Sequence, residues 1–165
     1  MIRLGLFIVA LSGCGSYDIT VNDYTVYGAP KIFLDFELPD EALNTCISQQ
    51  IIDQRITSAE DLVALNCSDA GIETLEGLSL FSQLEQLKLS NNRIRNLVVL
   101  GQLRALKAVW LDGNMVIDPV PLQPLPELRW VDLSGNSNLQ CPKKSLFGQV
   151  ETLKLPNHCS DPAQL

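Results

Sequence analysis

Side chains able to do covalent or acid–base chemistry are few in this 165-residue chain, which has five cysteines and one histidine. His158 directly precedes Cys159, the nearest approach in the sequence to a nucleophile beside a base. Neighbouring side chains on an extended segment point apart, so this pair is poorly placed for proton transfer. The sequence has no phosphate-binding loop, zinc signature or G-x-S-x-G motif. We therefore predict a protein that is not an enzyme, with no catalytic residue, metal site or cofactor.

The two tryptophans, Trp110 and Trp130, offer binding chemistry instead. An indole combines a large apolar ring with one N–H donor, and tryptophan is over-represented among binding hot spots. The two residues form one site only if the fold places their segments side by side. The elements that carry them therefore decide the question.

A 22-residue repeat runs through the chain and places the tryptophans in neighbouring copies. The central copies start at Leu84, Leu106 and Leu128 with the pattern Leu-x-x-apolar-x-Leu-x-x-Asn, and the outer copies start at Leu62 and Val150 without the Asn. No unit of this length buries its apolar face alone, so successive units must stack and share a core. Alternating apolar residues predict one short strand per unit, and adjacent strands pair into a parallel sheet.

An asparagine follows the strand of each central copy, at Asn92, Asn114 and Asn136. A buried amide can donate to and accept from backbone groups of consecutive units, so we predict a structural asparagine ladder. Apolar residues continue on the return limb of each unit and predict that this limb also packs inward. Prolines on the third return limb forbid a regular helix there; they are Pro119, Pro121, Pro124 and Pro126. In the fourth unit the apolar register is lost at Asn138 and Lys144, and the nearest apolar replacements are Leu139 and Leu146.

Outward-facing residues of the strands form the candidate binding surface. Its polar and aromatic members are Gln86, Lys88, Trp110, Asp112, Trp130, Asp132 and Lys154. Two large rings on neighbouring strands, offset by two positions, can share an apolar patch with a charged rim. A protein or peptide fits this surface best, and a glycan stacked on the indoles is a second class of ligand. The alternative is that the indoles cover the sheet or contact the segment from Tyr17 to Phe36.

The repeat resembles the 22-residue class of leucine-rich repeats in bacterial internalin-like proteins, over about Leu62 to His158. The resemblance implies an α/β solenoid with a short curved parallel sheet, whose concave face would bind the ligand. It also implies an irregular or short-helical convex side and an N-terminal cap helix.

The segment before the repeats resembles such a cap. Asp40 is the expected N-cap of a helix, and Leu43, Ile47 and Ile51 lie on one face at helical spacing. The run Thr57-Ser58-Ala59-Glu60 offers a capping box that leads into the first unit.

The N-terminus resembles a bacterial lipoprotein signal. Arg3 precedes an apolar run from Leu4, and Leu11-Ser12-Gly13-Cys14 resembles a lipobox. The run is short for a membrane span, which takes about 20 apolar residues, and a buried strand is the alternative. The resemblance implies removal of residues 1–13, lipidation of Cys14 and, because Gly15 follows, sorting to the outer membrane. Exposure to the periplasm or to the outside is left open.

Four cysteines are left once Cys14 is assigned to the lipid, an even number in a compartment that permits disulfides. Three pairings are possible in principle. Topology favours Cys46 with Cys67, because Cys67 holds an inward position of the first unit beneath the cap helix. Cys141 and Cys159 then staple the last two units. A free apolar thiol at Cys67 is the alternative.

The formal charge of −7 becomes −8 without residues 1–13, because Arg3 is the only charge they carry. An acidic surface argues against nucleic acid or anionic membrane as the main partner, so membrane attachment falls to the lipid on Cys14. We expect a tether at 14–38, in which a hairpin and a linker are both compatible with the sequence. The cap region then covers 39–61, the repeats 62–159 and a tail 160–165.

Two functions follow from these observations. The first is a lipid-anchored recognition module that binds a protein, a peptide or, with less support, a glycan through its sheet. The second is a structural or envelope-assembly lipoprotein whose sheet is covered by a partner subunit or by the tether.

Overall fold

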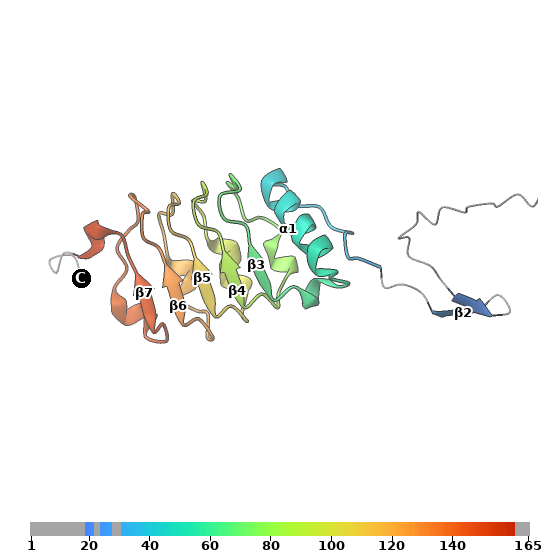
Figure 1. The fold of residues 1–165 in the computed structure, drawn as a ribbon. Helices are drawn as coiled ribbons and strands as arrows, with labels where there is room; N and C mark the ends of the chain where they lie inside the picture. Colours follow the sequence, from blue (N-terminus) through green and yellow to red (C-terminus); the bar gives the residue numbers. More distant parts are fainter. Residues whose placement is uncertain (1–18, 22–23, 28–30, 161–165) are drawn as a thin grey trace, which may run out of the picture. The chain divides into compact units, whose positions relative to one another are not determined.

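The computed structural model describes residues 19–21, 24–27 and 31–160, which fall into two units divided after Lys31 (Figure 1). In the first unit, β1 (Ile19–Val21) and β2 (Tyr24–Tyr27) form an antiparallel hairpin. The expected signal peptide at 1–13 and the lipidated Cys14 lie outside the described residues. Within the described residues, no helix is long and apolar enough to cross a membrane.

The second unit begins at Ile32 and is built on a five-stranded parallel sheet (Figure 1). Its strands, in chain order and in sheet order, are β3 (Ala64–Asn66), β4 (Gln86–Lys88), β5 (Ala108–Trp110), β6 (Trp130–Asp132) and β7 (Thr152–Lys154). Each residue pairs with the residue 22 positions later, as Leu65 does with Leu87. The sequence repeat is therefore the register of the sheet, and the predicted leucine-rich repeat solenoid is confirmed.

Apolar side chains of the strands and of the return limbs form one core. The inward strand residues from the second to the fourth coil are fully buried: Leu87, Leu89, Val109, Leu111, Val131 and Leu133. The return limbs of the first four coils contain short 3₁₀ helices: η2 (Leu78–Leu80), η3 (Val98–Gln102), η4 (Val120–Leu122) and η5 (Lys144–Phe147). On the proline-rich third limb, η4 is only three residues long. On the fourth limb Leu139 is buried as expected, whereas Leu146 is 51% exposed because Phe147 fills the core instead.

The asparagine ladder forms within this core. Nδ2 of Asn136 donates to the carbonyl oxygens of Leu111 (2.9 Å) and Leu133 (2.8 Å), and Oδ1 accepts from the backbone N–H of Val116 (2.8 Å). Asn114 makes the same kind of contacts one coil earlier, and Asn92 makes them two coils earlier. Each amide thus joins the backbones of two consecutive coils.

Helix α1 (Glu41–Gln54) covers the first coil (Figure 1). Asp40 is its N-cap, since one carboxylate oxygen accepts from the backbone N–H of Leu43 at 3.0 Å. The other oxygen accepts from Glu73 N–H (2.8 Å) and Thr74 N–H (2.9 Å), which ties the cap to the first coil. Burial raises the pKa of Asp40, but these backbone donors lower it by more, so its pKa lies below the ordinary value. The apolar face of α1 is buried as predicted.

The capping box lies one residue later than predicted. The short 3₁₀ helix η1 spans Ala59–Asp61, so Ser58 is its N-cap. The backbone N–H of Ser58 donates to the carboxylate of Asp61 at 3.1 Å, and Thr57 Oγ1 donates to the same carboxylate at 3.2 Å. The expectation for Glu60 was therefore wrong, because the first helical residue is Ala59.

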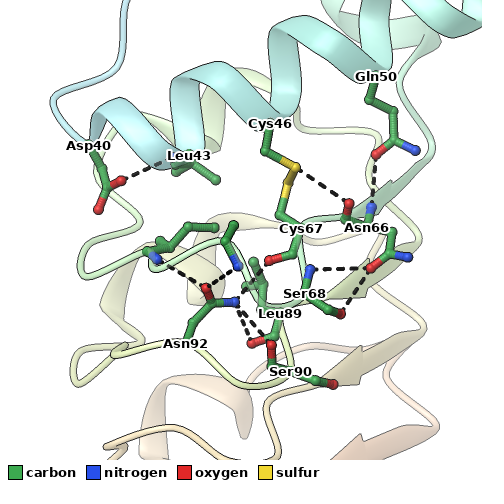
Figure 2. Close-up of a disulfide and its surroundings, with 12 residues drawn as sticks. Asp40, Leu43, Cys46, Gln50, Asn66, Cys67, Ser68, Leu89, Ser90 and Asn92 are labelled. Atoms are coloured by element: carbon green, nitrogen blue, oxygen red, sulfur yellow. Dashed lines mark hydrogen bonds between the residues drawn. A yellow bond between two sulfur atoms is a disulfide. The ribbon is translucent and has the colours of Figure 1, made fainter.

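Two disulfides close the ends of the solenoid. Cys46 of α1 is bonded to Cys67, which is 1% exposed at an inward position after β3 (Figure 2). Cys141 is bonded to Cys159 in the last two coils. The pairing that topology favoured is confirmed, and Cys67 is not a free thiol. Loops of about 20 residues make each bond worth about 3 kcal/mol in the chain-entropy model.

Aromatic residues before the cap helix belong to the solenoid. Phe33 and Phe36 stack on each other and meet Phe81 edge-on, with ring centroids 6.5 Å and 5.4 Å from it. The backbone N–H of Phe33 also donates to the carbonyl oxygen of Ile56 at 2.9 Å. The apolar segment within the expected tether therefore packs against the core around Phe81 and not on the tryptophans.

Candidate binding surface on the parallel sheet

The outward side chains of β3 to β7, together with the residues that directly follow each strand, form the sheet face. Gln86 and Lys88 of β4 are exposed, and Trp110 and Trp130 are half-buried. In the sheet register, Lys88 lies beside Trp110, and Trp110 lies beside Asp132. All the residues predicted for the candidate site therefore lie on or next to one surface.

The two indoles share one patch at the centre of this face. Their ring centroids are 6.2 Å apart and the planes are tilted by 37°. Trp110 is on β5 and Trp130 on β6, so the offset of two residues brings the rings together diagonally across neighbouring strands. Contact between the rings stabilises both side chains.

A lysine flanks each indole. Lys88 Nζ lies 5.2 Å from the ring centroid of Trp110, and Lys154 Nζ lies 5.0 Å from that of Trp130. Across β4 to β7 the sheet face thus presents a cation, two indoles and a second cation, here called the Lys–Trp–Trp–Lys row. Such contacts are worth about 0.5–1 kcal/mol at exposed sites and hold the ammonium groups over the rings.

Asp132 was predicted as a rim charge, but the structure buries it to 6% exposure. Its carboxylate accepts from Lys154 Nζ at 3.1 Å and from the hydroxyl of Ser134. Burial raises the pKa of Asp132, whereas the Ser134 hydroxyl and Lys154 lower it by more, so the carboxylate stays ionised. Asp132 therefore positions Lys154 beside Trp130 and does not face the solvent.

Asp112 and Lys88 differ in how they are paired. The Asp112 carboxylate accepts from the Ser90 hydroxyl at 2.6 Å. Lys88 contacts the Trp110 ring, and no carboxylate within the described part of the chain forms an ion pair with it. Lys88 is therefore the lysine of the row whose ammonium group is available to bind an anionic group of a ligand.

Trp130 carries a feature that the sequence does not reveal. Its Nε1 is buried and has no hydrogen-bond acceptor among the residues that the structure describes. A buried donor without an acceptor costs about 1–3 kcal/mol. An oxygen acceptor for Nε1 would therefore stabilise the Trp130 side chain.

Residues of the cap extend the sheet face beyond the predicted set. A shallow pocket of about 160 Å³ beside Lys88 is lined by Gln50, Gln54, Ala64, Leu65, Asn66, Gln86 and Lys88. Gln50 Oε1 accepts from the backbone N–H of Asn66 at 2.9 Å, so α1 partly covers the free edge of β3 (Figure 2). The repeat pattern does not cover α1, so only the helical position of Gln50, three residues after Ile47, could have suggested this contact.

The His158–Cys159 pair makes no nucleophile and base. Cys159 is bonded to Cys141, and His158 Nε2 lies 2.9 Å from the carbonyl oxygen of Leu139. The ring lies on η6 (Asn157–Ser160) and does not repeat the contacts of the asparagine ladder, in which each amide donates to the carbonyl three residues earlier. Ligand atoms of Cys141, His158 and Cys159 lie within 4.8 Å of one another, but both sulfurs are held in the disulfide.

Comparison with known proteins identifies the fold. No protein-family model and no curated protein matches this sequence. The internalin InlF of Listeria monocytogenes matches in structure with a TM-score of 0.60 at 20% identity, over 78% of this chain and 39% of its own. The functional domain of InlJ from Listeria monocytogenes, described as including a cysteine ladder, matches with a TM-score of 0.60 at 19% identity, over 70% of this chain and 26% of its own. This chain thus spans well under half the length of these proteins, and what it shares with them is the leucine-rich repeat fold of internalins.

Proposed function

We propose that this protein is a non-enzymatic recognition module that binds a protein or peptide through the sheet face. The observation that carries the proposal is the Lys–Trp–Trp–Lys row, in which two adjoining indoles lie between two ammonium groups on a rigid sheet. Half-buried tryptophans with a polar surround are typical of the centre of a protein interface.

The row favours a peptide over a glycan. A sugar that stacks on an indole needs a free ring face, and here Lys88 lies over Trp110 and Lys154 lies over Trp130. A peptide side chain can instead contact the edges of both rings and the stems of both lysines. The strands present these groups from a sheet whose core is fully buried, so the surface is preorganised for binding.

Replacing Trp110 and Trp130 together with Ala tests the proposal. Two hot-spot residues are worth about 2 kcal/mol or more each, so we expect at least a hundredfold loss of ligand affinity, about 2.7 kcal/mol, with folding retained. The immobilised chain without residues 1–13 is used to capture proteins from an envelope extract, and the affinity of the captured protein for each variant is then measured. Urea unfolding shows whether each variant is folded. The matched control, Val98→Ala with Val120→Ala, truncates two apolar side chains that are 61% and 53% exposed on η3 and η4. Equal capture by both variants, or unfolding of the tryptophan variant alone, would reject the proposal in favour of a structural role.

We further propose that the module is tethered by lipid on Cys14 to the outer membrane of a bacterial envelope. The lipobox-like run and the acidic charge of the chain, which disfavours electrostatic attachment, support this proposal. In a bacterial host, Cys14→Ser is expected to move the protein from the membrane fraction to the soluble fraction, and mass spectrometry of the N-terminal peptide should show acyl chains in the wild type only. A wild-type N-terminus that keeps residues 1–13 without lipid would contradict the proposal.

A further inference from the structure

We infer that the segment bound on the sheet face carries a carboxylate beside an apolar side chain, and that Lys88 binds the carboxylate. This inference rests on the proposed function and specifies the chemistry of the partner. It follows from the different surroundings of the two lysines and from the buried N–H of Trp130.

The two lysines of the row are not equivalent. Lys154 donates to the buried carboxylate of Asp132, so its charge is largely compensated within the protein. Lys88 is exposed, and no ion pair involves it within the described residues. Asp112, two residues after Trp110, accepts from the hydroxyl of Ser90. A carboxylate of the partner therefore meets one available ammonium, at the β4 side of the indole pair.

The apolar side chain of the partner belongs beside this contact. Lys88 and Trp110 are register partners on β4 and β5, so a group that reaches Lys88 also reaches the outer edge of the Trp110 ring. When an apolar side chain covers that edge it excludes water, and the charge-assisted hydrogen bond to Lys88 becomes stronger. The shallow pocket beside Lys88, which is lined by amide side chains, offers further donors to the same carboxylate.

Among the described residues, the side chain of Trp130 also lacks a hydrogen-bond acceptor, which a partner could supply. Nε1 of Trp130 has no acceptor within the part of the chain that the structure describes. Because this N–H is buried, an oxygen of the partner reaches it only when the ring rotates on binding. An extended peptide with an acidic residue supplies the carboxylate for Lys88, and its backbone carbonyls supply an oxygen for the rotated ring.

The charge of the whole protein limits how acidic the partner can be. The formal charge is −7, so the protein as a whole repels a long polyanion. One or two carboxylates in an otherwise apolar segment fit the surface, whereas nucleic acid does not. The attraction comes from one exposed charge contact at Lys88. Salt therefore weakens binding only by the contribution of that contact.

Selection of a random phage-displayed peptide library on the immobilised full chain tests the inference. We expect enriched peptides to place Asp or Glu next to an aromatic or aliphatic residue. We expect Lys88→Gln to bind them about tenfold or more weakly than the wild type, as loss of one charge-assisted hydrogen bond implies. Lys144→Gln is the matched control, because Lys144 is also exposed but lies on η5, on the opposite limb of the coil. Its binding should equal that of the wild type.

The outcomes separate the inference from the proposed function. Enriched peptides that are basic or uncharged, or that bind the Lys88 variant as well as the wild type, would overturn the inference and leave peptide binding intact. Failure to enrich any peptide that depends on Trp110 and Trp130 would overturn the proposed function itself. Circular dichroism of the Lys88 variant shows whether its fold is intact, and a salt titration of wild-type binding from about 0.05 M to about 0.5 M should weaken it several-fold independently of any variant.

Discussion

Asn136→Ala is expected to lower the free energy of unfolding by about 3 kcal/mol or more. The substitution removes the amide that contacts the buried carbonyls of Leu111 and Leu133 and the buried N–H of Val116. Asn114 still donates to the Leu111 carbonyl, so the Leu133 carbonyl and the Val116 N–H are the groups that lose their side-chain partner. Each buried backbone group left without a partner costs about 1–3 kcal/mol. Because Asn136 is fully buried, water cannot replace the lost amide without opening the core.

Urea unfolding at equilibrium measures this loss. Asn138→Ala is the matched control, because Asn138 is exposed in the same coil and its replacement should change the free energy of unfolding by less than about 0.5 kcal/mol. Similar losses for the two variants would mean that the asparagine ladder contributes nothing specific to the stacking of coils.

Phe81→Ala is expected to lower the free energy of unfolding by about 3–5 kcal/mol and to loosen the segment that precedes the cap helix. Phe81 is fully buried, and the edge-on contacts of Phe33 and Phe36 with it hold that segment against the first coil. Removal of the ring leaves a cavity and takes away the partner of both phenylalanines.

Two measurements on the Phe81 variant are expected to change together. Urea unfolding should show the loss of stability, and limited proteolysis should cut between residues 32 and 39 faster than in the wild type. Leu80→Ala, at the neighbouring residue that is 46% exposed, should leave both nearly unchanged. A Phe81 variant that loses stability without faster cleavage would show that Phe33 and Phe36 are held by other contacts.

Backbone features of this fold were predictable because they depend on spacing alone. The 22-residue period became the sheet register, and the residues at inward positions became the core. Cys46 and Cys67 were paired correctly because their positions on the cap helix and on the first coil leave few alternatives. The N-cap role of Asp40 followed from residue type and from the start of the apolar face.

Side-chain arrangements on the sheet face were less predictable. Spacing placed Trp110 and Trp130 together, but it did not show that Asp132 is buried under Lys154 or that Lys88 covers Trp110. Long side chains from neighbouring strands choose among several rotamers, and that choice depends on all of their contacts at once. The predictions for the capping box and for Leu146 were each wrong by one residue, since Ser58 is the N-cap and Phe147 is the buried residue. A shift of one residue in a 3₁₀ turn changes which side chain faces inward.

The central claim is that a partner binds on the sheet face, over the indole pair. Nitrogen-15 NMR spectra recorded while a selected peptide is added test it most directly, because the chain has only two tryptophans and both lie in the row. We expect both indole N–H signals to shift with the same saturation curve, while the backbone signals of η3 and η4 stay in place. A peptide that binds but leaves both indole signals unmoved, and shifts the signals of η3 and η4 instead, would contradict the claim.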